Sequence, residues 1–195
     1  MTLSTQADST NNWSKSLGNI RIDQGEQTGN VSSVNGSVYL ADDSQVGSAS
    51  TVNGSIRVEN DVKADALSTV NGSIKIGQRV SVDGDVETVN GNIGIKNDGR
   101  VGGSVKTVNG TIGLIDTEVG GNLETTNGDL ELTGSTLTGD IIFNDNVVLF
   151  SVSRDLPTLT IDANSKVGGQ IILHQKVQLK IHESASVGEI IHHYR

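Results

Sequence analysis

The sequence contains no cysteine, one proline and few aromatic residues, which make up 3% of its 195 residues. Without cysteine the chain has no disulfide, no thiol nucleophile and no cysteine-ligated metal site. Cysteine usage therefore does not indicate whether the protein works in an oxidising or a reducing compartment. The shortage of aromatic rings argues against base-stacking platforms and aromatic-lined pockets. No apolar run approaches the roughly 18 residues of a spanning helix. We therefore expect no membrane insertion.

Positive charge is also scarce, since Lys and Arg total 14 against 23 Asp and Glu, a formal net charge of −9. Nucleic acids and anionic membranes attract basic surfaces, so we expect no nucleic-acid partner. Residues 1–12 are polar and hold no apolar signal-peptide core, and residues 4–12 resemble the polar spacer that often follows a cleaved signal. The residues alone leave two alternatives open, a cytoplasmic protein and a mature exported domain whose signal peptide has been removed.

The sequence is rich in glycine, with 24 residues, and it is repetitive. The tripeptide Val/Thr-Asn-Gly recurs six times at steps of 18 or 19 residues. Four positions after each Val or Thr stands an apolar residue, and a second follows two positions later, as in Ile74 and Ile76. That spacing of two is typical of a strand with those side chains on one face. A second block, V-G-G-x-V/L, completes the unit, as at 101–105 and 119–123.

A repeat of 18–19 residues with two or three short strands predicts one rung of an all-β, single-stranded parallel β-helix, or β-solenoid. The hexapeptide pattern of left-handed helices is absent, which favours a right-handed helix. The expected domain covers residues 15–195, after a polar segment and cap at 1–14 in which Trp13 covers the open end. An insertion interrupts the period at about 142–158.

The inserted segment is the most apolar stretch outside the rungs. Its Leu149 and Phe150 are the predicted contacts for a partner or a second subunit. The alternative interpretation is a wider rung with an extra strand. Because bulky or polar residues stand at both ends of the repeat, we expect a monomer or a small oligomer and not a filament.

Aligned residues of neighbouring rungs lie ~4.8 Å apart, so the repeated asparagines should form a stacked amide ladder. Threonine precedes the Val of most units, and Ser, Asn or Thr follows the Gly. If these side chains face outward, they form a nearly uncharged face that could meet polysaccharide hydroxyls or order water, as ice-contacting faces do. The candidate binding face comprises Thr51, Asn53, Ser55, Thr69, Asn71, Ser73, Thr88, Asn90, Asn92, Thr107, Asn109 and Thr111.

Residues able to perform chemistry are thinly spread. His174 and His193 should share a column and could share a metal, but no third ligand is placed, so no metal site or cofactor is predicted. Asp129 and Glu131 share a strand face without a second acid in register, and no Ser-His-Asp set can be assembled. We expect a protein that is not an enzyme.

The repeated S/T-V-N-G-S/N-I with V-G-G-x-V/L, over residues 17–195, resembles the toastrack adhesin family of bacterial β-helix proteins. The resemblance implies a bacterial envelope or exported protein, and it offers no catalytic residues. On this basis we expect a periplasmic, cell-surface or secreted protein whose signal peptide has been removed, with a cytoplasmic protein as the alternative. The Val/Ile-rich rungs and Gly columns are also similar to bactofilins, β-helices that polymerise end to end in the cytoplasm. The expected function is a non-enzymatic structural or adhesive module that binds an extended polymer or partner through its side. Candidate partners are polysaccharide and another envelope protein; the alternatives are a bactofilin-like scaffold and ice binding by Thr/Asn/Ser rows.

Overall fold

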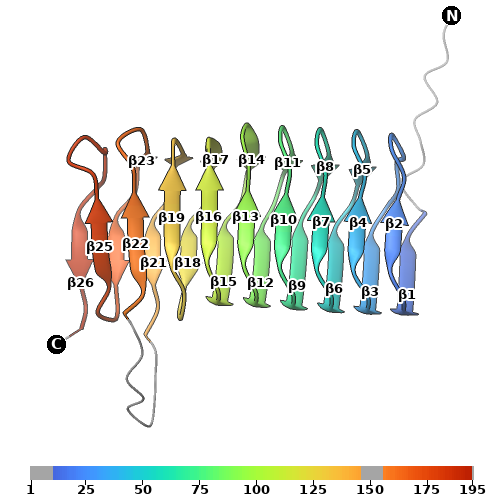
Figure 1. Ribbon diagram of the computed structural model, residues 1–195, viewed down its shortest axis with the longest axis horizontal. Helices are drawn as coiled ribbons and strands as arrows, with labels where there is room; N and C mark the ends of the chain where they lie inside the picture. Colours follow the sequence, from blue (N-terminus) through green and yellow to red (C-terminus); the bar gives the residue numbers. More distant parts are fainter. Residues whose placement is uncertain (1–10, 146–155, 195) are drawn as a thin grey trace, which may run out of the picture.

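The computed structural model describes residues 11–145 and 156–194, and in these ranges every regular element is a β-strand (Figure 1). The strands form three parallel sheets of ten, nine and seven strands that run side by side along one axis. The predicted parallel β-helix is therefore confirmed.

The sheets are named A, B and C in the order in which the chain enters them. Sheet A contains β1 (Trp13–Leu17), β3 (Val31–Asn35), β6 (Ala49–Asn53), β9 (Leu67–Asn71), β12 (Val86–Asn90), β15 (Val105–Asn109), β18 (Leu123–Thr125), β21 (Ile141–Phe143), β24 (Ile171–Leu173) and β26 (Ile190–His192). Sheet B contains β2 (Ile20–Ile22), β4 (Val38–Leu40), β7 (Ile56–Val58), β10 (Ile74–Ile76), β13 (Ile93–Ile95), β16 (Ile112–Ile115), β19 (Leu130–Thr133), β22 (Thr158–Ile161) and β25 (Gln178–Ile181). Sheet C contains β5 (Gln45–Val46), β8 (Lys63–Ala64), β11 (Ser81–Val82), β14 (Gly99–Val101), β17 (Thr117–Val119), β20 (Thr136–Leu137) and β23 (Lys166–Val167).

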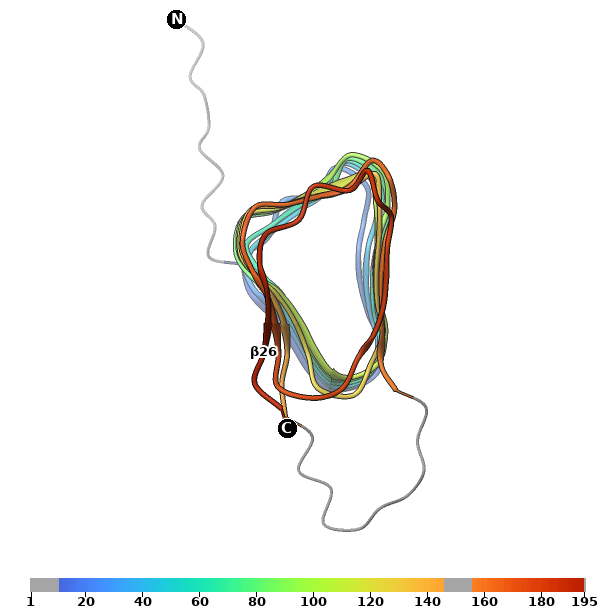
Figure 2. The same cartoon turned by 90° about the vertical axis from the view of Figure 1, so that its left-hand side faces the viewer.

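One rung comprises a strand from each sheet, for example β9, β10 and β11, and each strand pairs in parallel with its equivalent in the next rung. The register places equivalent residues of the repeat together, such as Asn53 with Asn71 and Ile56 with Ile74. Viewed from the C-terminal end, the chain descends sheet A and ascends sheet B while it advances toward the viewer (Figures 1 and 2). The helix is right-handed, as expected.

The core is a single column of apolar side chains that point inward from all three sheets. It extends without interruption from Ile20 to Leu173. The central residues of sheet B, Ile74, Ile93 and Ile112, are at most 1% exposed. Each such side chain contributes roughly 1.5–3 kcal/mol when it is buried. Since a rung can bury this surface only against its neighbours, the rungs must fold together.

The Gly of the Val-Asn-Gly tripeptide is required by space at the corner between sheets A and B. A Cβ atom on Gly72 would lie 2.0 Å from the carbonyl oxygen of Gly54 in the preceding rung. The corner between sheets B and C uses a different device, a column of residues with positive φ. Five of them carry side chains, at φ of 46–61°: Asp43, Asp61, Arg79, Asp98 and Asp116.

The stack begins at Trp13, slightly before the expected boundary, and Trp13 aligns with the inward-facing Val31 of the next rung. The period breaks between β21 and β22, where a hydrogen-bonded pair is 29 residues apart instead of 18 or 19. Sheet B then continues in register, with Leu130 opposite Leu159. Leu149 and Phe150, the predicted partner contacts, lie outside the described residues.

Candidate functional site

The structure corrects the expected binding face at its threonines. The four threonines of the Thr-Val-Asn segments are each only 4% exposed, and their hydroxyls donate hydrogen bonds of 2.8–3.1 Å to glycine carbonyls of the preceding rung. The donor residues are Thr51, Thr69, Thr88 and Thr107, and the acceptors are Gly36, Gly54, Gly72 and Gly91. The cause is strand alternation, because the residue two positions earlier, such as Val86, already points into the core. These hydroxyls serve the fold and are not available to a ligand.

The outward positions of the same strands carry valine. Five valines in successive rungs are 39–45% exposed: Val34, Val52, Val70, Val89 and Val108. Because equivalent residues of paired strands lie ~4.8 Å apart, they form a straight apolar row along the axis. A continuous row of exposed apolar side chains often marks a site of interaction with a partner or ligand.

Beside this row stands the predicted amide ladder, which the structure confirms. Each Asn side-chain nitrogen donates to the side-chain oxygen of the equivalent Asn in the preceding rung, over 2.8–3.0 Å. The ladder residues are Asn35, Asn53, Asn71, Asn90, Asn109 and Asn127. An amide has two donors and two acceptor lone pairs, so each ladder member retains a free N–H and a free lone pair. We call the valine row and the ladder together the Val–Asn face.

The remaining candidate residues stand just beyond the ladder, at the corner. Ser55 and Ser73 each accept a 3.2 Å hydrogen bond from a backbone N–H of the next rung, and Asn92 accepts one of 2.9 Å from Thr111. These four side chains are exposed or half-buried. They therefore border the Val–Asn face and also stabilise the corner.

On the opposite side of the valine row lies a charged row. Lys106 stands between two acids, with its Nζ atom 3.6 Å from Glu87 Oε1 and 3.9 Å from Glu124 Oε1. A shallow groove of about 400 Å³ runs between these residues and Val70, Val89 and Val108. The valine row is thus flanked by neutral amides on one side. On the other side it is flanked by serines in the first rungs and by alternating charges from Glu87 onward.

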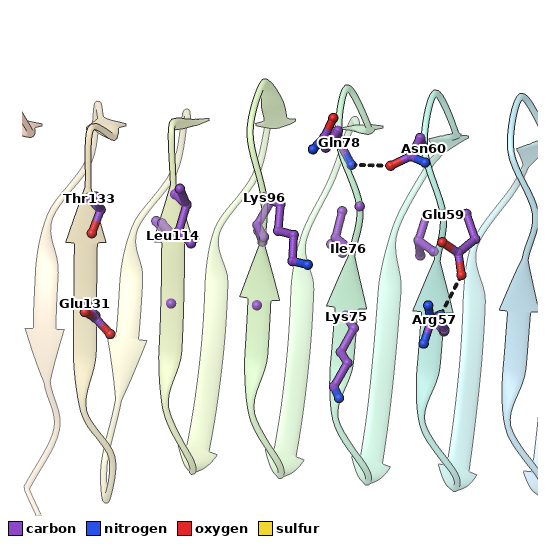
Figure 3. Close-up of a pocket in the computed structure, with 16 residues that line it drawn as sticks. Arg57, Glu59, Asn60, Lys75, Ile76, Gln78, Lys96, Leu114, Glu131 and Thr133 are labelled. Atoms are coloured by element: carbon purple, nitrogen blue, oxygen red, sulfur yellow. Dashed lines mark hydrogen bonds and ion pairs between the residues drawn. The ribbon is translucent and has the colours of Figure 1, made fainter.

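A second groove, of about 600 Å³, lies on the outer face of sheet B (Figure 3). Its floor is formed by Gly94 and Gly113, which occupy outward positions in the middle of β13 and β16. A Cβ atom on either glycine would meet nothing within 4 Å, and neither has a positive φ. Glycine inside a strand costs about 0.5–1 kcal/mol relative to alanine and often marks the close approach of a ligand or another backbone. Packing within the chain does not explain these two glycines.

Charged residues stand at the two ends of the glycine floor. The same outward column carries Lys75 before Gly94 and Glu131 after Gly113. Lys96 and Ile115 stand beside the floor, and Ile115 is 43% exposed. Our sequence reasoning missed this groove. The signal was present, since Ile-Gly-Ile and Ile-Gly-Leu replace the Ile-Arg-Val, Ile-Lys-Ile and Leu-Glu-Leu of neighbouring rungs.

At the corner between sheets B and C, four of the five positive-φ residues that carry side chains are aspartates, and the fifth is Arg79. Arg79 stands in the column of aspartates and forms a two-pronged ion pair with Asp61, of 2.6 and 2.7 Å. The hydrogen bonds that Arg79 donates to the Asp61 carboxylate lower the pKa of Asp61 and raise the pKa of Arg79. This arginine separates Asp61 from Asp98 and so relieves repulsion between successive rungs.

At the C-terminal end, His174 and His193 stack as expected from their shared column, with ring centroids 4.9 Å apart and planes inclined by 13°. Among residues 11–145 and 156–194, no group of three or more His, Asp or Glu side chains is placed to hold a metal ion. The same ranges contain no helix long and apolar enough to cross a membrane.

Comparisons with protein-family models, with curated proteins and with solved structures found no match for this chain. Its function must therefore be argued from its own surfaces.

Proposed function

We propose that this protein is a non-enzymatic structural or adhesive module of the bacterial envelope or secreted fraction, which binds an extended polymer along the Val–Asn face. The observation that carries the proposal is the unbroken row of exposed valines beside the amide ladder, from Val34 to Val108. A ligand that uses every rung must itself be extended, because the contacts repeat every ~4.8 Å along the axis.

The chemistry of this face fits a polysaccharide better than a folded partner. Sugar rings have apolar C–H faces, which valine side chains can contact, and hydroxyl groups at their rims. The free N–H and lone pair of each ladder amide can donate to and accept from such hydroxyls. The ladder holds its amides in fixed positions, so little side-chain entropy is lost when the polymer binds.

The ice-binding alternative depended on outward rows of threonine hydroxyls. These hydroxyls instead donate hydrogen bonds to backbone carbonyls of the preceding rung, which weakens that alternative. A measurement of thermal hysteresis tests it directly. The bactofilin-like scaffold predicts filaments that electron microscopy would detect. Either result would replace the adhesive proposal.

The test is binding to a panel of neutral and acidic polysaccharides, by glycan array and by co-sedimentation with insoluble polymers. The Val70→Lys, Val89→Lys double variant adds two long charged side chains to the middle of the valine row. We expect it to weaken binding at least about tenfold, the effect of losing about 1.4 kcal/mol. The matched control is Ser81→Lys, Thr136→Lys, which adds the same charge at outward positions of sheet C.

The control variant should bind like the parent. A parent that binds no polysaccharide in the panel contradicts the proposal. So does a Val70→Lys, Val89→Lys variant that retains both its fold by circular dichroism and its full binding.

A further inference from the structure

The outward column at the centre of sheet B has opposite charges at equal distances from its midpoint. In successive rungs it reads Lys75, Gly94, Gly113, Glu131. The midpoint falls between the two glycines, and each charge stands one and a half rungs from it, or ~7 Å. A surface with this pattern is complementary to itself when the order of its rungs is reversed.

We propose that a second copy of this chain docks face to face on the groove over Gly94 and Gly113. The two-fold axis runs parallel to the strands, between the two glycines. This symmetry reverses the order of the rungs and so places Lys75 opposite Glu131 of the partner subunit, and Glu131 opposite the partner's Lys75. A two-fold interface must match a surface to itself in this way.

The glycines have a physical role in this arrangement. Facing sheets normally stand ~10 Å apart, with their side chains interdigitated between them. Because Gly94 and Gly113 have no side chains, they leave room above the floor in which the long side chains of Lys75 and of the partner's Glu131 can lie and meet. Alanine at these positions would fit the isolated chain, with nothing within 4 Å of its Cβ. The space is needed only by a docked partner.

The apolar residue beside the floor obeys the same symmetry. Lys96 and Ile115 are consecutive in the next outward column and share the rungs of Gly94 and Gly113. The two-fold axis therefore brings Ile115 of each copy against the aliphatic stem of the partner's Lys96. This contact covers a large side chain that is 43% exposed in the single chain.

The association should be weak and sensitive to salt. Each chain carries a net charge of −9, so two copies repel one another at long range. The attraction is local, and charge pairs at an interface chiefly determine which surfaces meet. Since this face belongs to sheet B, the Val–Asn face of each copy stays free, and the pairing does not depend on the proposed polymer binding.

The test is a charge exchange followed by sedimentation equilibrium over a range of protein concentrations. Lys75→Glu and Glu131→Lys should each weaken dimerisation at least about tenfold. The double variant restores both opposed pairs and the net charge of −9, and it should dimerise like the parent. Lys63→Glu on sheet C is the matched control for Lys75→Glu, because it changes the net charge equally on another face.

The Glu131→Lys result is the most informative, since this change lowers the overall repulsion between copies and would strengthen any association that is not specific. A parent that is monomeric throughout, or a double variant as weak as the single variants, overturns the proposal. Circular dichroism of each variant separates lost pairing from lost folding, and polysaccharide binding measured in parallel should be unchanged by these substitutions.

Discussion

The hydroxyl of Thr88 donates a 2.9 Å hydrogen bond to the carbonyl oxygen of Gly72 in the preceding rung. Gly72 stands at the tight corner between sheets A and B, where a Cβ atom would collide with the backbone of the preceding rung. A carbonyl that burial partly shields from water needs a donor, and the inward threonine supplies it without leaving the core. The repeat therefore uses Thr at an inward position because it combines a β-branched shape with a hydroxyl.

Replacing Thr88 by Val should lower the free energy of unfolding by about 1 kcal/mol, since the Gly72 carbonyl would lose its donor. Thr125 occupies the equivalent position later in the stack, is fully buried, and its hydroxyl has no hydrogen-bond partner among the described residues. Thr125→Val should therefore leave the stability unchanged or raise it by up to about 1 kcal/mol. Urea unfolding of the two variants measures the contrast, and equal losses would show that the hydrogen bond is not the cause.

Glycine substitutions should separate the two kinds of glycine column. Gly72→Ala places a Cβ atom 2.0 Å from a backbone oxygen and should destabilise the protein by more than about 2 kcal/mol. Gly94→Ala meets open space and should stabilise the monomer by about 0.5–1 kcal/mol. Thermal melts at low protein concentration, where the proposed dimer dissociates, make the comparison. A loss of stability in Gly94→Ala would mean that this glycine is needed within the chain itself.

A single carboxylate in the core should prevent folding. Ile93 is 1% exposed in the centre of sheet B, and Asp at this position would bury a charge without a partner. Because rungs stabilise one another, damage at one rung should spread along the stack. We expect Ile93→Asp to yield no soluble folded protein, while Lys96→Asp, on the outer face of the same rung, should give a normal β-sheet spectrum by circular dichroism. A soluble Ile93→Asp variant that melts like the parent would refute the inward position.

The sequence predicts sheet B and the stacking of the rungs well. Once the period is known, the Ile-x-Ile alternation indicates a strand whose two Ile side chains point into the core. Sheet A was harder. The predicted outward face contained the Thr of Thr-Val-Asn, yet the structure places this Thr inward and the Val that follows it outward. The alternation that begins at the inward Val86 places Thr88, two positions later, on the same inward face. The inward position of Thr is hard to predict because a hydroxyl is rarely buried unless an acceptor is available. Here the acceptor is a carbonyl of the preceding rung, which the sequence of one rung does not reveal.

The groove on sheet B could not be predicted from residue types alone. Most glycines of this chain are required by close approach to another rung, as Gly72 is. The sequence shows that Gly94 replaces a charged residue of the Ile-x-Ile unit, but it does not show whether another rung lies against it. In the folded chain, a Cβ atom at Gly94 meets nothing within 4 Å. The charge symmetry could not be predicted from residue types either, since the equal spacing of Lys75 and Glu131 from the glycines depends on the register of sheet B.

Acid should weaken the protein partly through Asp162, which follows β22 at the corner between sheets B and C. Its carboxylate accepts a 2.6 Å hydrogen bond from the Ser165 hydroxyl and a 3.0 Å bond from the backbone N–H of Gly134 in the preceding rung. These bonds, with that from Ser165 the strongest cause, lower the pKa of Asp162 below its ordinary value. A lowered pKa in the folded state stabilises the protein above the unfolded pKa, and this contribution disappears as the pH falls through the folded value.

Asp162→Asn removes these charge-assisted bonds, so it should melt at a lower temperature than the parent at pH 7. Because an ordinary Asp titrates near pH 4, the difference between the two melting temperatures should shrink steadily below about pH 4 as the parent loses its own contribution. Asp65→Asn is the matched control, since Asp65 is exposed and its carboxylate forms no hydrogen bond or ion pair within the part of the chain that the structure describes. It should leave the melting temperature nearly unchanged at pH 7. A difference between parent and Asp162→Asn that stays constant from pH 7 to pH 2 would mean that the Asp162 charge does not stabilise this corner.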